Sequence, residues 1–140
     1  APSGQEQCYR IIVDELPSAD ADRKGMQFVL RYSVPIFLLP PGNTEPSPTL
    51  SAQVVAGSDG KAQIQISNTG TGHAQVADLR HQVDGATKTA LNGLVGYVLP
   101  GQTMRWSLGA PVAQFGRGTI IARINGEADE RTLLAAPTAP

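Results

Sequence analysis

The chain has 140 residues, which is the size of one ordinary domain, and it is 41% hydrophobic and 16% charged. The formal net charge of −1, with no basic tract, argues against nucleic acid as a partner. No stretch of about 18 apolar residues is present, so no membrane insertion is expected. No signal segment opens the sequence either, which predicts a mature chain or a fragment whose start has been lost. Fifteen glycines and eleven prolines predict many turns and therefore many short strands.

The first predicted strand is the stretch 8–16, which reads CYRIIVDEL and is ended by Pro17. Alternate side chains of this stretch form an apolar row on one face, made of Tyr9, Ile11 and Val13. A loop of charged and small residues, 18–25, follows and predicts a connection to a second strand. The single cysteine, Cys8, excludes an internal disulfide, and we expect it to be a small core residue.

The stretch 26–39 predicts a strand well above the usual length of about 5–6 residues. One face of it carries a continuous apolar row, made of Met26, Phe28, Leu30, Tyr32, Val34, Ile36 and Leu38. Pro35 lies inside the stretch and has no N–H to donate to a ladder, which predicts a strand at a sheet edge. A long hydrophobic edge strand promotes aggregation unless a partner covers it, so the pattern favours a binding strand over an ordinary core strand.

A proline-rich linker, 41–48, separates this predicted hairpin from a regular series of strands in 49–136. About seven strands are expected there, with turn signals roughly every 8–12 residues, which is typical of an immunoglobulin-like β-sandwich. They are predicted at 50–55, 61–68, 74–83, 94–99, 102–108, 119–124 and 131–135. The chain is therefore predicted to be all-β, with Trp106 in the core of the sandwich.

Irregularities are expected in the middle of this series. The apolar alternation fails near Asp78, which predicts a bulge or a change of sheet. The dipeptides 84–85 (Asp-Gly) and 92–93 (Asn-Gly) predict tight turns. The alanines of 76–91 also allow a helix, but Gly85 and a weak helical period favour strands.

No motif for catalysis or metal binding is found, since the sequence lacks G-x-S-x-G, a Walker loop and H-E-x-x-H. Asp14 and Glu15 are adjacent, so on a strand they point to opposite faces and do not form an acid–base pair. His73 and His81 have no cysteine partner, which disfavours a metal site. The sequence therefore predicts neither an enzyme nor a cofactor.

Three stretches carry a family resemblance as a set: YRIIVDELP (9–17), LRYSVPIFLLP (30–40) and GYVLPGQTMRW (96–106). Together with the intervening NTGTGHAQV (68–76), their order and spacing resemble the periplasmic pilus-assembly chaperones, the PapD-like family with two immunoglobulin-like domains. The branch that they resemble assembles secreted or spore-coat-type pili. The resemblance implies an incomplete first domain in 1–40, of which only the last two strands are present. The linker 41–48, a second domain in 49–136 and a tail in 137–140 follow.

The resemblance implies a periplasmic chaperone that binds and stabilises pilus subunits by donating an edge strand, and that delivers them to the outer-membrane usher. On this reading four side chains on the donated strand anchor the subunit: Met26, Phe28, Leu30 and Tyr32. Two basic residues of the family grip the subunit's terminal carboxylate; one falls on an absent strand and the other aligns with Pro35. Arg10 and Arg31 are the candidate substitutes. The alternative function is a structural or adhesive immunoglobulin-like module of a surface appendage.

Overall fold

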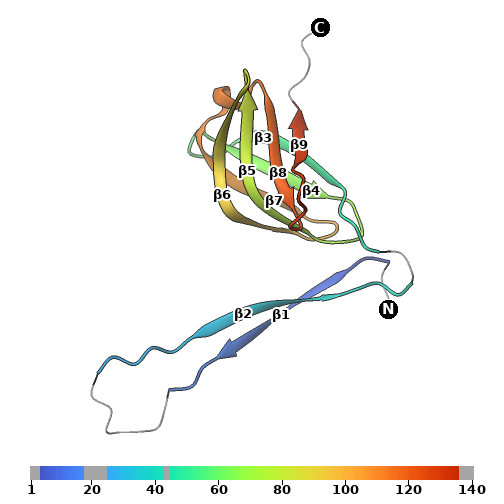
Figure 1. The fold of residues 1–140 in the computed structure, drawn as a ribbon, viewed down its shortest axis with the longest axis vertical. Helices are drawn as coiled ribbons and strands as arrows, with labels where there is room; N and C mark the ends of the chain where they lie inside the picture. The colour runs from blue at the N-terminus through green and yellow to red at the C-terminus, as the bar shows by residue number, and fades with distance from the viewer. Residues whose placement is uncertain (1–3, 18–24, 43–44, 136–140) are drawn as a thin grey trace.

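The computed structural model describes residues 4–17, 25–42 and 45–135, and apart from one short 3-10 helix the regular secondary structure of these residues is all β-strand (Figure 1). The strands are β1 Gln7–Asp14, β2 Arg31–Leu38, β3 Leu50–Ala56, β4 Lys61–Asn68, β5 Ala74–Val83, β6 Ala86–Val98, β7 Thr103–Pro111, β8 Thr119–Ile124 and β9 Arg131–Ala135, with a 3-10 helix η1 at Val112–Phe115. Among these residues no helix is long and apolar enough to span a membrane.

Three antiparallel sheets are formed in the described part of the chain. One contains β1 and β2 alone, the second has the order β3-β4-β7, and the third has the order β6-β5-β8-β9. The second and third sheets are the two layers of an immunoglobulin-like sandwich, and the β1–β2 hairpin extends away from it (Figure 1). The predicted all-β, immunoglobulin-like fold is therefore confirmed.

The core of the sandwich follows from the period of two along each strand. In β4 the buried residues alternate with half-buried polar ones, because one face of a strand meets the opposite sheet and the other faces solvent. The largest fully buried apolar side chains come from both sheets and are Ile64, Ile66, Val76, Leu79, Val98 and Ile124. Trp106 lies at the margin of this core, half-buried against it, rather than fully inside it.

The predicted bulge at Asp78 is confirmed. Asp78 has a positive φ of 50°, and the pairing of β5 with β6 shifts register on both sides of it. The shift explains why the buried positions of β5 change from even-numbered to odd-numbered residues. The predicted turn at 84–85 is also confirmed, because Val83 pairs with Ala86 and both central residues have positive φ.

The predicted turn at 92–93 is wrong, and β6 continues from Ala86 to Val98 without a break. Gly93 does have a positive φ of 69°, but its N–H donates to Oδ1 of Asp78 at 2.9 Å. Gly93 therefore stabilises the bulge between β5 and β6 by its hydrogen bond to Asp78. A turn dipeptide in a long strand marks such a bulge when the facing strand is irregular at the same level.

Strand β2 is shorter than the predicted strand 26–39, because its ladder ends with its partner. Glu15 donates its N–H to the Leu30 carbonyl at 2.9 Å, and the Leu30 N–H turns to the Glu15 carboxylate at 3.1 Å. Pro17 follows and cannot extend the ladder. Cys8 is likewise not a core residue, since it lies half-exposed in the two-stranded hairpin.

The predicted loop 18–25 and the predicted tail 137–140 lie outside the described residues, apart from Gly25. The linker 41–48 is described except for 43–44. The division into an incomplete domain, a linker and a second domain stays a prediction.

Candidate functional site

The hairpin carries an exposed apolar face. Antiparallel pairing runs from Gln7 opposite Leu38 to Asp14 opposite Arg31, and this register brings the two predicted apolar rows onto one face. The row on β1 is Tyr9, Ile11 and Val13, and the row on β2 is Tyr32, Val34, Ile36 and Leu38. Apart from the half-buried Ile36, these side chains are between 45% and 55% exposed. A contiguous exposed apolar face of this kind marks an interaction site.

The four predicted anchors follow one another along the approach to β2 and into it. Met26 and Phe28 are the most exposed, at 81% and 79%, and they precede the strand together with Leu30. Tyr32 alone lies within β2. All four side chains are thus accessible to a partner, but only Tyr32 is held by a ladder to β1.

The outer edge of β2 has a defined set of main-chain groups. In an antiparallel ladder, opposed pairs alternate between those that exchange both main-chain hydrogen bonds and those that exchange none. The bond from Glu15 N–H to the Leu30 carbonyl lies one position beyond Asp14 and Arg31, so that pair is of the second kind. Because the two kinds of pair alternate, the other β2 residues that exchange no main-chain hydrogen bonds with β1 are Ser33, Pro35 and Phe37. Their main-chain groups point away from β1.

The second face of the hairpin is mixed, with polar and apolar side chains that include the exposed Ile12, and it carries both predicted basic residues. Arg31 is paired with its cross-strand neighbour Asp14, with Nε 2.5 Å and Nη2 3.2 Å from the two carboxylate oxygens. The side-chain hydrogen bond to Asp14 raises the pKa of Arg31 above its ordinary value. Arg10 instead donates from Nη1 to the Ser33 hydroxyl at 2.8 Å. Arg31 is therefore already neutralised by a carboxylate, whereas Arg10 has a neutral partner.

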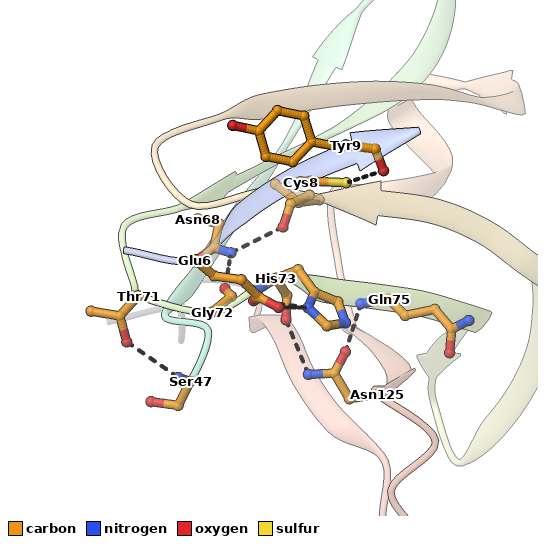
Figure 2. A network of polar contacts seen from close by, with 11 residues as sticks. Glu6, Cys8, Tyr9, Ser47, Asn68, Thr71, Gly72, His73, Gln75 and Asn125 are labelled. Atoms are coloured by element: carbon orange, nitrogen blue, oxygen red, sulfur yellow. Dashed lines mark hydrogen bonds and ion pairs between the residues drawn. The ribbon is translucent and has the colours of Figure 1, made fainter. Parts of the chain in front are cut away.

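A network of polar contacts (Figure 2) and a stacked aromatic pair join the base of the hairpin to the sandwich. Glu6, just before β1, is buried, and its carboxylate accepts the His73 N–H at 2.6 Å and lies 2.9 Å from the ring Nδ1 of the same residue. Its own N–H donates to the Thr71 carbonyl at 2.8 Å. From β2, the Phe37 ring stacks on the His73 ring, with centroids 3.8 Å apart. Both strands of the hairpin are thus attached at His73.

The end of the linker is attached to the neighbouring loop. The N–H groups of Thr71 and Gly72 donate to the Ser47 carbonyl at 2.9 and 3.1 Å. Asn68 is fully buried and accepts from the N–H groups of Thr49 and Gly70 at 3.1 and 2.9 Å. It also donates to two carbonyls, those of Gly72 and Val98. Loop 68–73 is therefore the common fastening point for both ends of the hairpin.

The sequence did not predict this fastening point. Glu6 precedes the first predicted strand, and the sequence pattern gave His73 no role beyond that of a disfavoured metal ligand. No pattern of period two connects a single glutamate to a histidine 67 positions away, so only the NTGTG run (68–72), which the resemblance included, indicated this loop. No group of three or more His, Cys, Asp or Glu that could hold a metal occurs in residues 4–17, 25–42 and 45–135.

A polar surface cavity of about 450 Å³ lies at the turn between β5 and β6 and the start of β8, at the end of the sandwich away from the hairpin. Arg117 and Asp84 line it and form an exposed ion pair at 2.8 Å. His81 nearby donates from Nε2 to the Arg117 carbonyl, 2.7 Å away. This cavity holds no arrangement of a nucleophile and a base, so the hairpin is the stronger candidate site.

No protein-family model and no curated protein matches the sequence. Among solved structures, the chain matches one in the CsuC–CsuE chaperone–tip adhesion subunit pre-assembly complex, from the archaic chaperone-usher Csu pili of Acinetobacter baumannii. The TM-score is 0.62 at 25% sequence identity, over 94% of this chain. This chain has a pilus-chaperone-like fold. The resemblance predicted from the sequence is thereby confirmed for the fold.

The pilus-chaperone-like chain spans 60% of the length of the chain that it matches. The match covers the hairpin as well as the sandwich, because 94% of the present chain is more than 49–136 alone. The hairpin is therefore part of the shared fold, and its exposed apolar face is the feature that any functional proposal has to explain.

Proposed function

We propose that this chain is a periplasmic chaperone that binds pilus subunits and stabilises them by lending the outer edge of β2. The observation that carries the proposal is the hairpin, which extends from the sandwich with an exposed apolar face and an unpaired β2 edge in the described part of the chain. The pilus-chaperone-like fold supports the same conclusion. Main-chain pairing would hold the subunit, and alternate side chains would fill its open groove.

The anchors proposed for the subunit groove are Met26, Phe28, Leu30 and Tyr32. Each side chain contributes roughly 1.5–3 kcal/mol when it is fully buried. Three or four of them supply on the order of 5–12 kcal/mol before the cost of ordering the segment, which suffices to hold a subunit without ATP. Since Met26–Leu30 precede β2, we propose that this segment extends the strand when the subunit binds.

Arg10 is the better of the two candidates for gripping a terminal carboxylate. It lies opposite Pro35, the position that the family resemblance aligns with a carboxylate-binding residue. Its guanidinium is held by a neutral hydroxyl, so a carboxylate gains a charge-assisted bond there. Arg31 would first have to leave Asp14.

The proposal includes the division of the chain into an incomplete domain 1–40, a linker 41–48 and a second domain 49–136. It also includes delivery of subunits to an outer-membrane usher and no enzymatic step. The folded sandwich would then serve as the platform on which loop 68–73 orients the hairpin.

Capture of a subunit tests the proposal. Denatured pilus subunits, both those encoded beside this chain's gene and the CsuE subunit, are diluted into the chain, and soluble one-to-one complexes are counted by size exclusion. We expect a complex with the parent chain and none with Phe28→Asp combined with Leu30→Asp. The control is Leu94→Asp, because Leu94 is an exposed apolar residue of the sandwich at 59%. Equal capture by all three chains contradicts the proposal, and self-assembly without a subunit favours a structural module instead.

A further inference from the structure

Pro35 divides β2 into two halves with different surroundings. The first half, 31–34, is exposed at every position, whereas Pro35, Ile36 and Phe37 are half-buried. Phe37 stacks on His73 and lies 6.1 Å from the Tyr97 ring, so the second half is held against the sandwich. The first half is free along its outer edge in the described part of the chain.

The proline also changes the set of main-chain groups on that edge. Arg31 and Ser33 each present an outward N–H and an outward carbonyl, because both belong to pairs that exchange no bonds with β1. Pro35 belongs to the same class, but it presents a carbonyl alone. The absence of an N–H at Pro35 therefore removes no hydrogen bond from the β1–β2 ladder. It removes one hydrogen-bond donor from the outer edge of β2.

We infer that Pro35 is the register-determining residue of this edge: a visiting strand pairs with Arg31 and Ser33, and its ladder ends at Pro35. The visitor is an extended segment of another polypeptide with alternating apolar and polar side chains. Its apolar side chains lie beside Tyr32 and Val34, and its polar ones lie beside Arg31 and Ser33. The inference rests on the proposed function only in assigning the partner to β2.

The opposite edge of the hairpin, formed by β1, has a different set of outward main-chain N–H groups. The outward N–H groups of β1 belong to Cys8, Arg10, Ile12 and Asp14, with no proline among them. An unbroken edge of this kind favours permanent pairing, whereas a proline limits pairing at the edge that carries it. The interruption in β2 therefore fits a strand that is bound and later released, and the exposed Phe28 and Leu30 extend only the β2 side.

Amide hydrogen exchange by NMR on the full chain tests the inference. In the free chain the amides of Tyr32, Val34 and Ile36, which are bonded to β1, should exchange more slowly than those of Arg31, Ser33 and Phe37. The probe is a synthetic peptide of about eight residues that alternates valine and threonine between terminal lysines. On adding it we expect protection at Arg31 and Ser33 and none at Phe37.

Two variants change only the outer edge. Pro35→Val restores one N–H, so protection should extend through position 35 to Phe37, and the peptide should bind about 3–10-fold tighter. Ser33→Pro removes one N–H and should abolish the protection, while Ser33→Ala loses only the hydroxyl and should keep it. Protection of Tyr32 and Val34 checks that the β1–β2 ladder survives in each variant.

Three results overturn the inference: protection that reaches Phe37 in the parent chain, protection along Cys8–Asp14 in place of β2, or no protection at Arg31 and Ser33. The peptide experiment requires no pilus subunit. A chain that pairs with the peptide as described but captures no subunit would refute the chaperone proposal alone. A chain that captures subunits but protects Phe37 would refute the register alone.

Discussion

The ring of Phe37 lies almost parallel to that of His73, with the planes inclined by 11° and the centroids 3.8 Å apart. The stacked pair connects β2 to the last residue of loop 68–73, while Glu6 holds the same histidine from the β1 side. The orientation of the hairpin therefore depends on His73, which both strands contact, together with the main-chain bond from Glu6 to Thr71. This dependence leads to the first prediction.

Phe37→Ala should loosen the hairpin without unfolding the sandwich. An aromatic pair contributes about 0.5–1.5 kcal/mol beyond its buried area, and the sandwich core contains neither ring. We expect lower NMR order parameters throughout β1 and β2. Phe115→Ala is the control, since Phe115 packs on the sandwich core and against His81, and it should lower the melting temperature while leaving the hairpin unchanged. Unchanged order parameters in the Phe37 variant contradict the prediction.

Arg10→Gln should weaken capture of a pilus subunit by about tenfold or more, because a charge-assisted bond to a terminal carboxylate contributes roughly 1.5–3 kcal/mol. Arg31→Gln should change capture much less, because Asp14 already neutralises that guanidinium. The hydrogen bond to Asp14 raises the pKa of Arg31, so this side chain keeps its charge throughout the physiological pH range. Titration of Arg31 should therefore contribute no pH dependence to capture or stability between about pH 6 and 9. Affinities measured by titration calorimetry decide between the two arginines, and a larger loss for Arg31→Gln contradicts the assignment.

Asn68→Ala should be the most destabilising single change in the loop at the base of the hairpin. Its buried amide satisfies two main-chain N–H groups and two carbonyls, and each buried group left without a partner costs about 1–3 kcal/mol. We expect a loss of at least about 3 kcal/mol in the free energy of unfolding, measured by urea denaturation. The exposed Asn92 supplies the control, as Asn92→Ala should cost under about 0.5 kcal/mol. Equal stability of the two variants would show that the amide is dispensable.

Gly70→Ala should separate the linker from the sandwich. A Cβ at position 70 would lie 2.3 Å from the Ser47 carbonyl oxygen and 2.5 Å from the Thr49 nitrogen, both main-chain atoms that cannot rotate away. Overpacking of this kind costs about 1–3 kcal/mol, so we expect a lower melting temperature and faster exchange of the Thr71 amide. Gly4→Ala meets nothing within 4 Å and should behave as the parent chain. A Gly70 variant as stable as the parent would contradict this packing.

Local pattern predicted most strands of the sandwich, but it placed the start of β6 at residue 94 instead of Ala86. The alternation in 61–68 predicted β4 with its observed bounds, because one buried face imposes a period of two. The apolar residues of 119–124 predicted the bounds of β8 as well, although Ile121 is buried along with its neighbours Ile120 and Ala122. The length of β2 was not predictable in the same way. Apolar alternation begins at Met26, yet a strand ends where its ladder partner ends, and that limit is set by Glu15 and Pro17 on another segment.

The attachment of the hairpin at His73 could not be predicted from the sequence, for a different reason. Glu6 and His73 are single polar residues in irregular segments, so neither periodicity nor turn chemistry connects them. The predicted anchor residues, in contrast, followed directly from the apolar row. Their exposure in the structure makes them accessible, and their binding role stays a prediction.

The hairpin has a mechanical consequence that follows from its attachment. The six residue steps from Phe37 to Arg31, at about 3.3 Å each, give a lever of roughly 20 Å, with its pivot at the Phe37–His73 and Glu6–His73 contacts. A pull near Arg31 therefore exerts its largest torque on the contacts at His73 and loop 68–73, before it acts on the sandwich core. A force on a partner bound near Arg31 would rotate the hairpin before it deformed the sandwich.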